Sequence, residues 1–145
     1  MNKFNPLQEV EDDGIKIPEV GNWSLKKWRL VGAYCDTFTK GMRNKWDQLV
    51  YIDLFAGAGF AKIKNKDRIY YSSSLISLSI PVKFDKYIFC EKDPELMTSL
   101  KERVENLYPE QNVSFILGDA NEKVKQIKNQ MPAYGKGNTR FPFVL

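Results

Sequence analysis

The sequence predicts an α/β protein built on the βαβαβ half of a doubly wound parallel sheet. Three short apolar runs, at residues 49–55, 86–91 and 113–117, have the composition of strands that are buried in such a sheet. Stretches with helical spacing separate the runs, and each run ends close to an acidic or glycine residue. Because the carboxyl ends of parallel strands meet at one edge of a sheet, we expect these residues to line one crevice.

The first run ends in a turn made of very small residues. The run is rich in β-branched and aromatic residues, and only Asp53 interrupts it. The turn is Ala56-Gly57-Ala58-Gly59, in which glycine permits a tight bend and lets backbone N–H groups approach a ligand closely. A carboxylate followed by such a turn is typical of a crevice for a nucleotide-type cofactor. An ordinary buried strand with a glycine turn is the alternative.

The motifs around this turn narrow the choice of cofactor. A dinucleotide fingerprint requires glycine or alanine where this chain has Lys62, and the chain contains no P-loop motif. The pattern Asp-x-Phe-x-Gly-x-Gly at residues 53–59 instead resembles the first motif of S-adenosylmethionine-dependent methyltransferases, including the Asp-Leu-Phe-Ala-Gly string of the cytosine-C5 DNA enzymes. In such proteins the glycine loop lies against the methionine and ribose parts of the cofactor.

The second and third strands each lead to an acid. Residues 86–91 end at Glu91, and Asp93-Pro94-Glu95 then starts a helix that runs to about Tyr108. An acid at the end of a second parallel strand is where a ribose diol is bound, although Glu91 can also be read as a solvated acid. Residues 113–117 precede Asp119, which could accept a hydrogen bond from the amine of adenine. Asn121 is expected to cap the next helix, and a fourth strand begins near the end of the chain, at residues 141–145.

The chain divides into two parts. Residues 1–22 carry prolines, glycines and an acidic cluster, which predict an N-terminal arm or partly ordered tail. Residues 23–145 form the domain, which starts with a helix capped by Ser24. Leu30, Tyr34, Phe38 and Met42 have the spacing of a buried stripe on this helix. The three tryptophans are expected in core packing, and a stacking surface for bases is the alternative reading.

Basic residues alternate along the segment after the glycine turn. Residues 61–71 predict a short exposed hairpin that carries Lys62, Lys64, Lys66 and Arg68 near the cofactor site. These charges fit a phosphate-bearing substrate, or equally a solvated hairpin whose charges discourage edge pairing. Ser72-Ser73-Ser74 then leads into a crossover helix with a serine cap, which ends at Pro81.

Composition indicates a single globular domain of 145 residues, with 43% hydrophobic and 28% charged residues. The chain has no histidine, and its two cysteines, Cys35 and Cys90, are expected to be buried thiols. A net charge of +4 permits a nucleic-acid partner without arguing for one. No apolar run is long enough to span a membrane and no signal peptide is recognisable, so a cytoplasmic location without a membrane partner is expected.

Five strings in this order resemble the three-Cys-motif partner protein family, a methyltransferase-like group. They are Val20-Gly21-Asn22-Trp23, Tyr51-Ile52-Asp53-Leu54-Phe55-Ala56-Gly57, Tyr87-Ile88-Phe89-Cys90-Glu91, Gly118-Asp119-Ala120-Asn121 and Pro142-Phe143-Val144-Leu145. Ala58 stands where that family usually has proline, and Ser72-Ser73-Ser74 stands where it has Gly-Ser-Pro.

The resemblance implies a Rossmann-like S-adenosylmethionine methyltransferase fold with a preceding helix, truncated at the fourth strand. The cofactor-binding residues that it implies are Asp53, Phe55, Ala56, Gly57, Gly59, Glu91, Asp119 and Ala120. It also implies a partner with a three-cysteine motif similar to radical-SAM proteins, and it supplies no catalytic residue.

Three functions remain open from the sequence. The first is an S-adenosylmethionine-binding methyltransferase domain that lacks its substrate-side half and is inactive alone. The second is a non-catalytic partner module, and the third is a fragment of a nucleic-acid-modifying methyltransferase. If the sheet ends at Leu145, we expect poor solubility, self-association through the truncated sheet, or a missing C-terminal segment with each of them.

Overall fold

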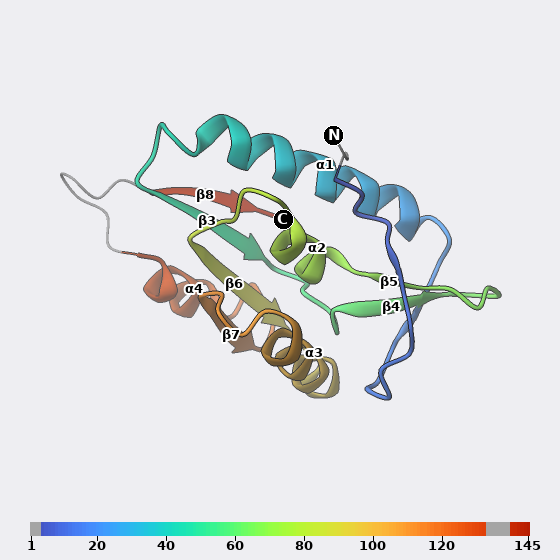
Figure 1. The fold of residues 1–145 in the computed structure, drawn as a ribbon. Helices are drawn as coiled ribbons and strands as arrows, with labels where there is room; N and C mark the ends of the chain where they lie inside the picture. Colours follow the sequence, from blue (N-terminus) through green and yellow to red (C-terminus); the bar gives the residue numbers. More distant parts are fainter. Residues whose placement is uncertain (1–3, 133–139) are drawn as a thin grey trace.

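A computed structural model describes residues 4–132 and 140–145, and Figure 1 shows its arrangement. The strands are β1 (Glu9–Val10), β2 (Glu19–Val20), β3 (Gln48–Asp53), β4 (Phe60–Ile63), β5 (Ile69–Tyr71), β6 (Lys86–Glu91), β7 (Val113–Leu117) and β8 (Arg140–Val144). The helices in the described ranges are α1 (Ser24–Met42), α2 (Ser73–Ser79), α3 (Pro94–Leu107) and α4 (Val124–Gln130).

The main sheet has the strand order β7-β6-β3-β8, and every neighbouring pair in it is parallel. The α/β prediction and the strands at 86–91 and 113–117 are therefore confirmed. The first strand ends at Asp53, two residues earlier than predicted. The fourth strand pairs with β3, so the chain order reverses direction at β3, with β6 on one side and β8 on the other. Open α/β sheets bind ligands at the carboxyl ends of strands beside such a switch point.

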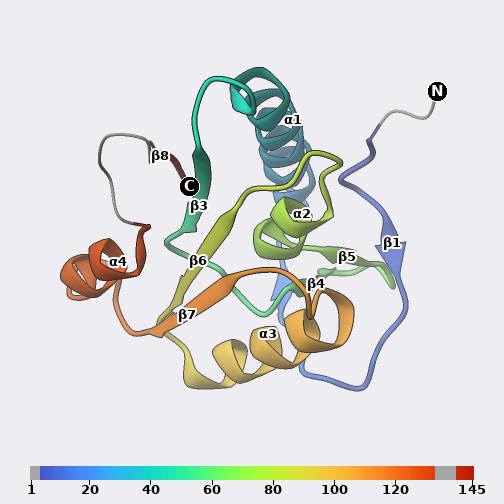
Figure 2. The same cartoon turned by 60° about the vertical axis from the view of Figure 1, so that its left-hand side comes forward.

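The two faces of the main sheet are covered differently. One face carries aromatic residues such as Tyr51, Tyr87 and Phe89, which pack in one core cluster with buried residues of α1, α2 and α3. The other face carries smaller residues, including Val50 and Ile88, and packs against Ile127 of α4. Figure 2 shows α4 on the opposite side of the strands from the other helices.

Strand β8 forms one of the two edges of the main sheet. The backbone N–H of Leu145 donates to the carbonyl of Ile52, and the carbonyl of Leu145 accepts from the N–H of Leu54. Every second residue before Leu145 therefore directs its N–H and carbonyl groups toward β3, and the residues between them direct these groups away from it. Pro142 belongs to the outward-pointing set and has no N–H to offer. An edge interrupted in this way is a poor template for another strand, and self-association through it stays a prediction.

The N-terminal segment is attached to the domain rather than extended from it. Strand β1 pairs with β5, β2 pairs with β4, and the second sheet has the order β1-β5-β4-β2. The predicted hairpin at residues 61–71 is confirmed as β4 and β5, but its strands are not exposed, because β1 and β2 cover both of its edges. The exposed part is the turn around Asn65, where φ is +64°.

An ion pair fastens this segment to α3. Arg103 is buried at 1% exposure, and its guanidinium donates to both carboxylate oxygens of Asp13 at 2.8 and 2.9 Å. Partial burial raises the pKa of Asp13, but the hydrogen bonds and charge of Arg103, together with the N–H of Ile15, outweigh it and leave the pKa below 3.8. The Asp13 carboxylate is therefore stabilised in its charged form.

Helix α1 buries a different face from the predicted one. Its buried line includes Trp28, Val31 and Cys35, whereas Leu30 and Tyr34 are 43% and 58% exposed. Apolar residues occupy two neighbouring faces of this helix, and contacts such as the Trp28–Tyr70 ring pair at 6.2 Å select the face that is buried. Phe38 and Met42, also in the predicted stripe, are partly buried against the core.

A side-chain hydrogen bond confirms the predicted cap of one helix only. Asp93 caps α3 by accepting from the N–H groups of Glu95 and Leu96. Ser24 is the first residue inside α1 rather than its cap, and α4 starts after Lys123, so Asn121 does not cap it. Ser72 occupies the cap position of α2, but its side chain makes no capping hydrogen bond.

Two predictions about composition are also settled within the described residues. Cys35 and Cys90 are free, buried thiols, as expected. Over residues 4–132 and 140–145, no helix combines the length and apolar character needed to cross a bilayer.

Candidate ligand site at the carboxyl ends of the parallel strands

The glycine loop, residues 54–59, follows β3 and depends on glycine at two positions. Gly57 has φ +71°, and a Cβ placed there would meet only the Ser72 hydroxyl, at 3.8 Å, so one side of the loop is open. Gly59 has φ +91°, and its Cβ would lie 3.0 Å from Leu75 and 3.3 Å from Leu100. Glycine is therefore required at position 57 by the positive φ of the loop. At position 59 it is required both by the positive φ and by the close packing of the loop on α2 and α3.

Glu91 joins the glycine loop to the end of β6. Its Oε1 accepts from the N–H of Gly57 and its Oε2 accepts from the N–H of Asp93, both at 2.8 Å. The N–H of Ala56 also donates to the carbonyl of Cys90 at 3.0 Å. Each carboxylate oxygen of Glu91 can accept a further hydrogen bond, because an ionised carboxylate has about four acceptor positions.

Asp53 lies beneath the loop rather than at its surface. It is 1% exposed, and its carboxylate accepts from Tyr51 Oη at 3.0 Å, Ser73 Oγ at 2.7 Å and the N–H of Phe55 at 3.1 Å. Burial raises the pKa of Asp53 above 3.8, although these hydrogen bonds and the charge of Lys27 counteract the rise. The side chain therefore fixes the start of the loop from inside the protein.

Asp119 follows β7 at the same end of the sheet. Its Oδ1 accepts from the N–H of Asn121 at 2.9 Å, and the N–H of Gly118 donates to the carbonyl of Glu91 at 2.9 Å. Burial raises the pKa of the Cys90 thiol, and the charges of Glu91, Asp119 and Asp53 raise it further. The three predicted acids therefore lie at the ends of three adjacent strands, on the same edge of the sheet.

A cavity of about 230 Å³ lies on the α1 and α2 side of the glycine loop. Three of the predicted cofactor-binding residues, Phe55, Ala56 and Gly57, contribute to its lining together with Trp23, Lys27 and Ser72. Phe55 is 75% exposed. The hydroxyl oxygen of Ser72 is buried and, in the part of the chain that the structure describes, has no hydrogen-bond partner. The cavity therefore combines exposed aromatic rings, a lysine and an unpaired hydroxyl.

The remaining predicted residues lie outside this cavity. Its lining does not include Glu91, Asp119 or Ala120. Ala120 instead lines a second, mainly apolar cavity of about 320 Å³ on the α4 side of the sheet, together with Leu54. The acids thus lie at one end of the sheet. Of the small residues near them, Ala56 and Gly57 line the cavity on the α1 and α2 side, and Ala120 lines the cavity on the α4 side.

Three residues that contribute to the site were not predicted as site residues. Lys27 and Ser72 line the cavity. Arg103 donates to the carbonyl of Ala58 at 2.8 Å and so supports the glycine loop from α3. The four-residue spacing of Trp23 and Lys27 indicates that Lys27 lies on the same side of the helix as Trp23. The sequence around Arg103 contains no pattern that indicates its contact with the glycine loop.

The chain matches no protein-family model, and no curated protein matches it. The site is therefore defined by its geometry, as a glycine loop and three acids at the carboxyl end of a parallel α/β sheet.

Proposed function

We propose that this chain binds S-adenosylmethionine or a closely related adenosyl ligand as a methyltransferase-like, Rossmann-type domain. The observation that carries the proposal is the hydrogen bond from the N–H of Gly57 to Glu91, at 2.8 Å. It joins a glycine loop to the acid at the end of the neighbouring parallel strand, which is the arrangement that a ribose-binding crevice needs.

The chemistry of the side chains fits the three parts of such a ligand. The amino-acid end carries a carboxylate, and Lys27 and the unpaired hydroxyl of Ser72 are suitable donors beside the glycine loop. Glu91 has acceptor positions left for a ribose diol. Asp119 has a second carboxylate oxygen, besides the one bonded to Asn121, for an exocyclic amine.

When bound, S-adenosylmethionine supplies an electrophilic methyl group. Methyl transfer depends mainly on proximity and orientation, so a chain without histidine is compatible with this reaction class. The residues named above bind and orient the ligand, and Asp53 holds the loop in place through its bond to the N–H of Phe55.

Calorimetric titration with S-adenosylhomocysteine tests the proposal. We expect a measurable binding heat for the unaltered chain, and about ten-fold weaker binding for Glu91→Gln, because a neutral amide accepts weaker hydrogen bonds from hydroxyl groups. Glu102→Gln is the matched control, since Glu102 is an exposed acid on α3, and it should leave the affinity unchanged.

Two results would count against this function. One is the absence of both binding heat and thermal stabilisation in the folded, unaltered chain. The other is equal affinity in the Glu91→Gln and Glu102→Gln variants, which would place the ligand away from β6. Interaction with a three-Cys-motif protein stays a separate prediction, and co-purification of the two proteins would test it.

A further inference from the structure

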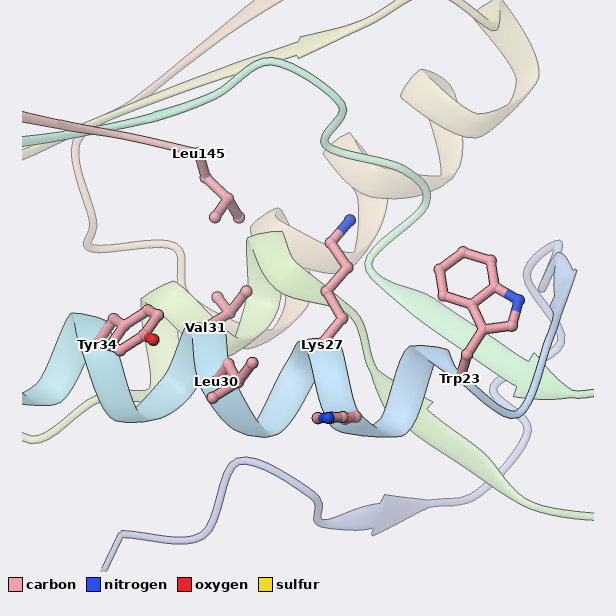
Figure 3. Close-up of a pocket in the computed structure, with 7 residues that line it drawn as sticks. Trp23, Lys27, Leu30, Val31, Tyr34 and Leu145 are labelled. Atoms are coloured by element: carbon pink, nitrogen blue, oxygen red, sulfur yellow. The ribbon is translucent and has the colours of Figure 1, made fainter.

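A groove of about 390 Å³ lies between α1 and the end of the chain at Leu145. Its lining consists of Trp23, Lys26, Lys27, Leu30, Val31, Tyr34 and Leu145. Figure 3 shows Trp23 and Tyr34 at the two ends of this row, with Lys27 rising from the helix and Leu145 reaching toward it from the opposite side. Trp23 and Lys27 also line the glycine-loop cavity, so the two hollows adjoin.

The aromatic residues of the groove are exposed and one of them is held in place. Trp23 is 73% exposed and Tyr34 is 58% exposed, so the core packing expected for the tryptophans holds for Trp28 and Trp46 but not for Trp23. A Cβ on Gly21 would clash with the indole nitrogen of Trp23, so the ring packs directly on the glycine backbone. Trp23 therefore presents an oriented aromatic face to solvent. Because the ring is already held in one position, its binding to a ligand costs little side-chain entropy.

Both charged residues in the lining of the groove are lysines. Lys26 and Lys27 belong to its lining, and the first turn of α1 has no acidic residue. The basic hairpin turn lies next to Trp23, because Lys66 Nζ donates to the Asn22 side chain at 3.2 Å and the N–H of Lys64 donates to the carbonyl of Val20 at 2.9 Å. Lysines from two elements thus flank one exposed tryptophan.

The lysines in the groove favour a nucleic-acid strand over a second copy of the chain as its occupant. A second copy of the chain docked face to face would bring the Lys26 and Lys27 pairs together, and like charges across an interface are unfavourable. A nucleic-acid strand presents phosphates to lysines and base faces to aromatic rings. A duplex keeps its base faces stacked inside, so only an unpaired base can lie on Trp23.

We propose that this groove is a binding site for single-stranded nucleic acid, with a base stacked on Trp23 and phosphates bound by Lys26 and the hairpin lysines. The site adjoins the proposed adenosyl-ligand site but does not depend on it, since the contacts invoked here lie on Trp23, α1, the hairpin turn and Leu145.

Fluorescence anisotropy of labelled oligonucleotides of about ten nucleotides, titrated with the full chain without cofactor, tests the proposal. We expect binding of single strands that weakens as salt is raised, and weaker binding of the matching duplex. Trp23→Ala should reduce the affinity about ten-fold or more through loss of stacking. Lys26→Ala should reduce the slope of log affinity against log salt by about 0.7. Lys125→Ala, an exposed lysine on α4 across the sheet, is the control and should change neither quantity.

Several outcomes would overturn the proposal. They are no binding at low salt, unchanged affinity in Trp23→Ala, and equal binding of duplex and single strand. A dimer in light scattering that Trp23→Ala dissociates would assign the groove to a second copy instead. Circular dichroism of Trp23→Ala should match that of the unaltered chain, because the residue is exposed. Failure of the S-adenosylhomocysteine titration leaves this test unaffected, since no cofactor is present in it.

Discussion

Replacing Arg103 with alanine is expected to lower the free energy of unfolding by about 3 to 5 kcal/mol. The guanidinium is fully buried, stacks at 4.4 Å over the ring of Phe60, and hydrogen-bonds to Asp13, Ile15, Lys16 and Ala58. Its removal leaves the Asp13 carboxylate and three carbonyl groups without their donor. The loss affects both the N-terminal segment and the glycine loop, because Arg103 contacts both.

Urea unfolding followed by circular dichroism measures this change. Arg68→Ala is the matched control, because Arg68 forms an exposed ion pair with Glu9 at 3.6 Å, and we expect no measurable change from it. If Arg103→Ala were as stable as Arg68→Ala, the ion pair with Asp13 would not hold the segment in solution.

The second large effect is expected from Asp53→Ala, which should lower the free energy of unfolding by about 2 to 4 kcal/mol. This substitution leaves the Tyr51 hydroxyl, the Ser73 hydroxyl and the Phe55 N–H without their acceptor. Asp53→Asn should cost less, because its amide retains an acceptor oxygen and hydroxyl groups can reverse their role as donors. Equal losses in the two variants would show that the hydrogen bonds are not the source of the stability.

The pH dependence of stability provides an independent check on Asp53. Burial raises the pKa of Asp53 in the folded protein above 3.8, so the folded state binds the proton more tightly than the unfolded state. The stability linked to this proton is fully present below the unfolded pKa, and it is lost as the pH rises through the folded pKa. Asp53→Asn should remove that part of the pH dependence.

The strands of the main sheet could be predicted because their signals are local. Residues 86–91 and 113–117 are short apolar runs that end in turn residues, and they coincide with β6 and β7. Asp93 before Pro94 is an equally local signal, and it caps α3 as expected. In contrast, β1 and β2 have two residues each, and only pairing with the distant hairpin defines them.

Features that depend on distant partners could not be predicted. The buried face of α1 is chosen by contacts with Tyr70 and the sheet, and the sequence of the helix alone allowed the neighbouring face with Leu30 and Tyr34. The pairing of Arg103 with Asp13 joins residues 90 positions apart. Within the site, the acids were predicted one by one, but the burial of Asp53 away from the loop surface follows from its partners Tyr51 and Ser73.

The proposed adenosyl ligand would lie across the carboxyl ends of β3, β6 and β7. Two-dimensional ¹H–¹⁵N spectra of the chain, recorded with increasing S-adenosylhomocysteine, test it most directly. We expect the amide signals of Gly57, Asp93 and Asn121 to shift together, because each of these N–H groups donates to Glu91 or Asp119. An unchanged spectrum, or shifts confined to residues away from these three loops, would contradict it.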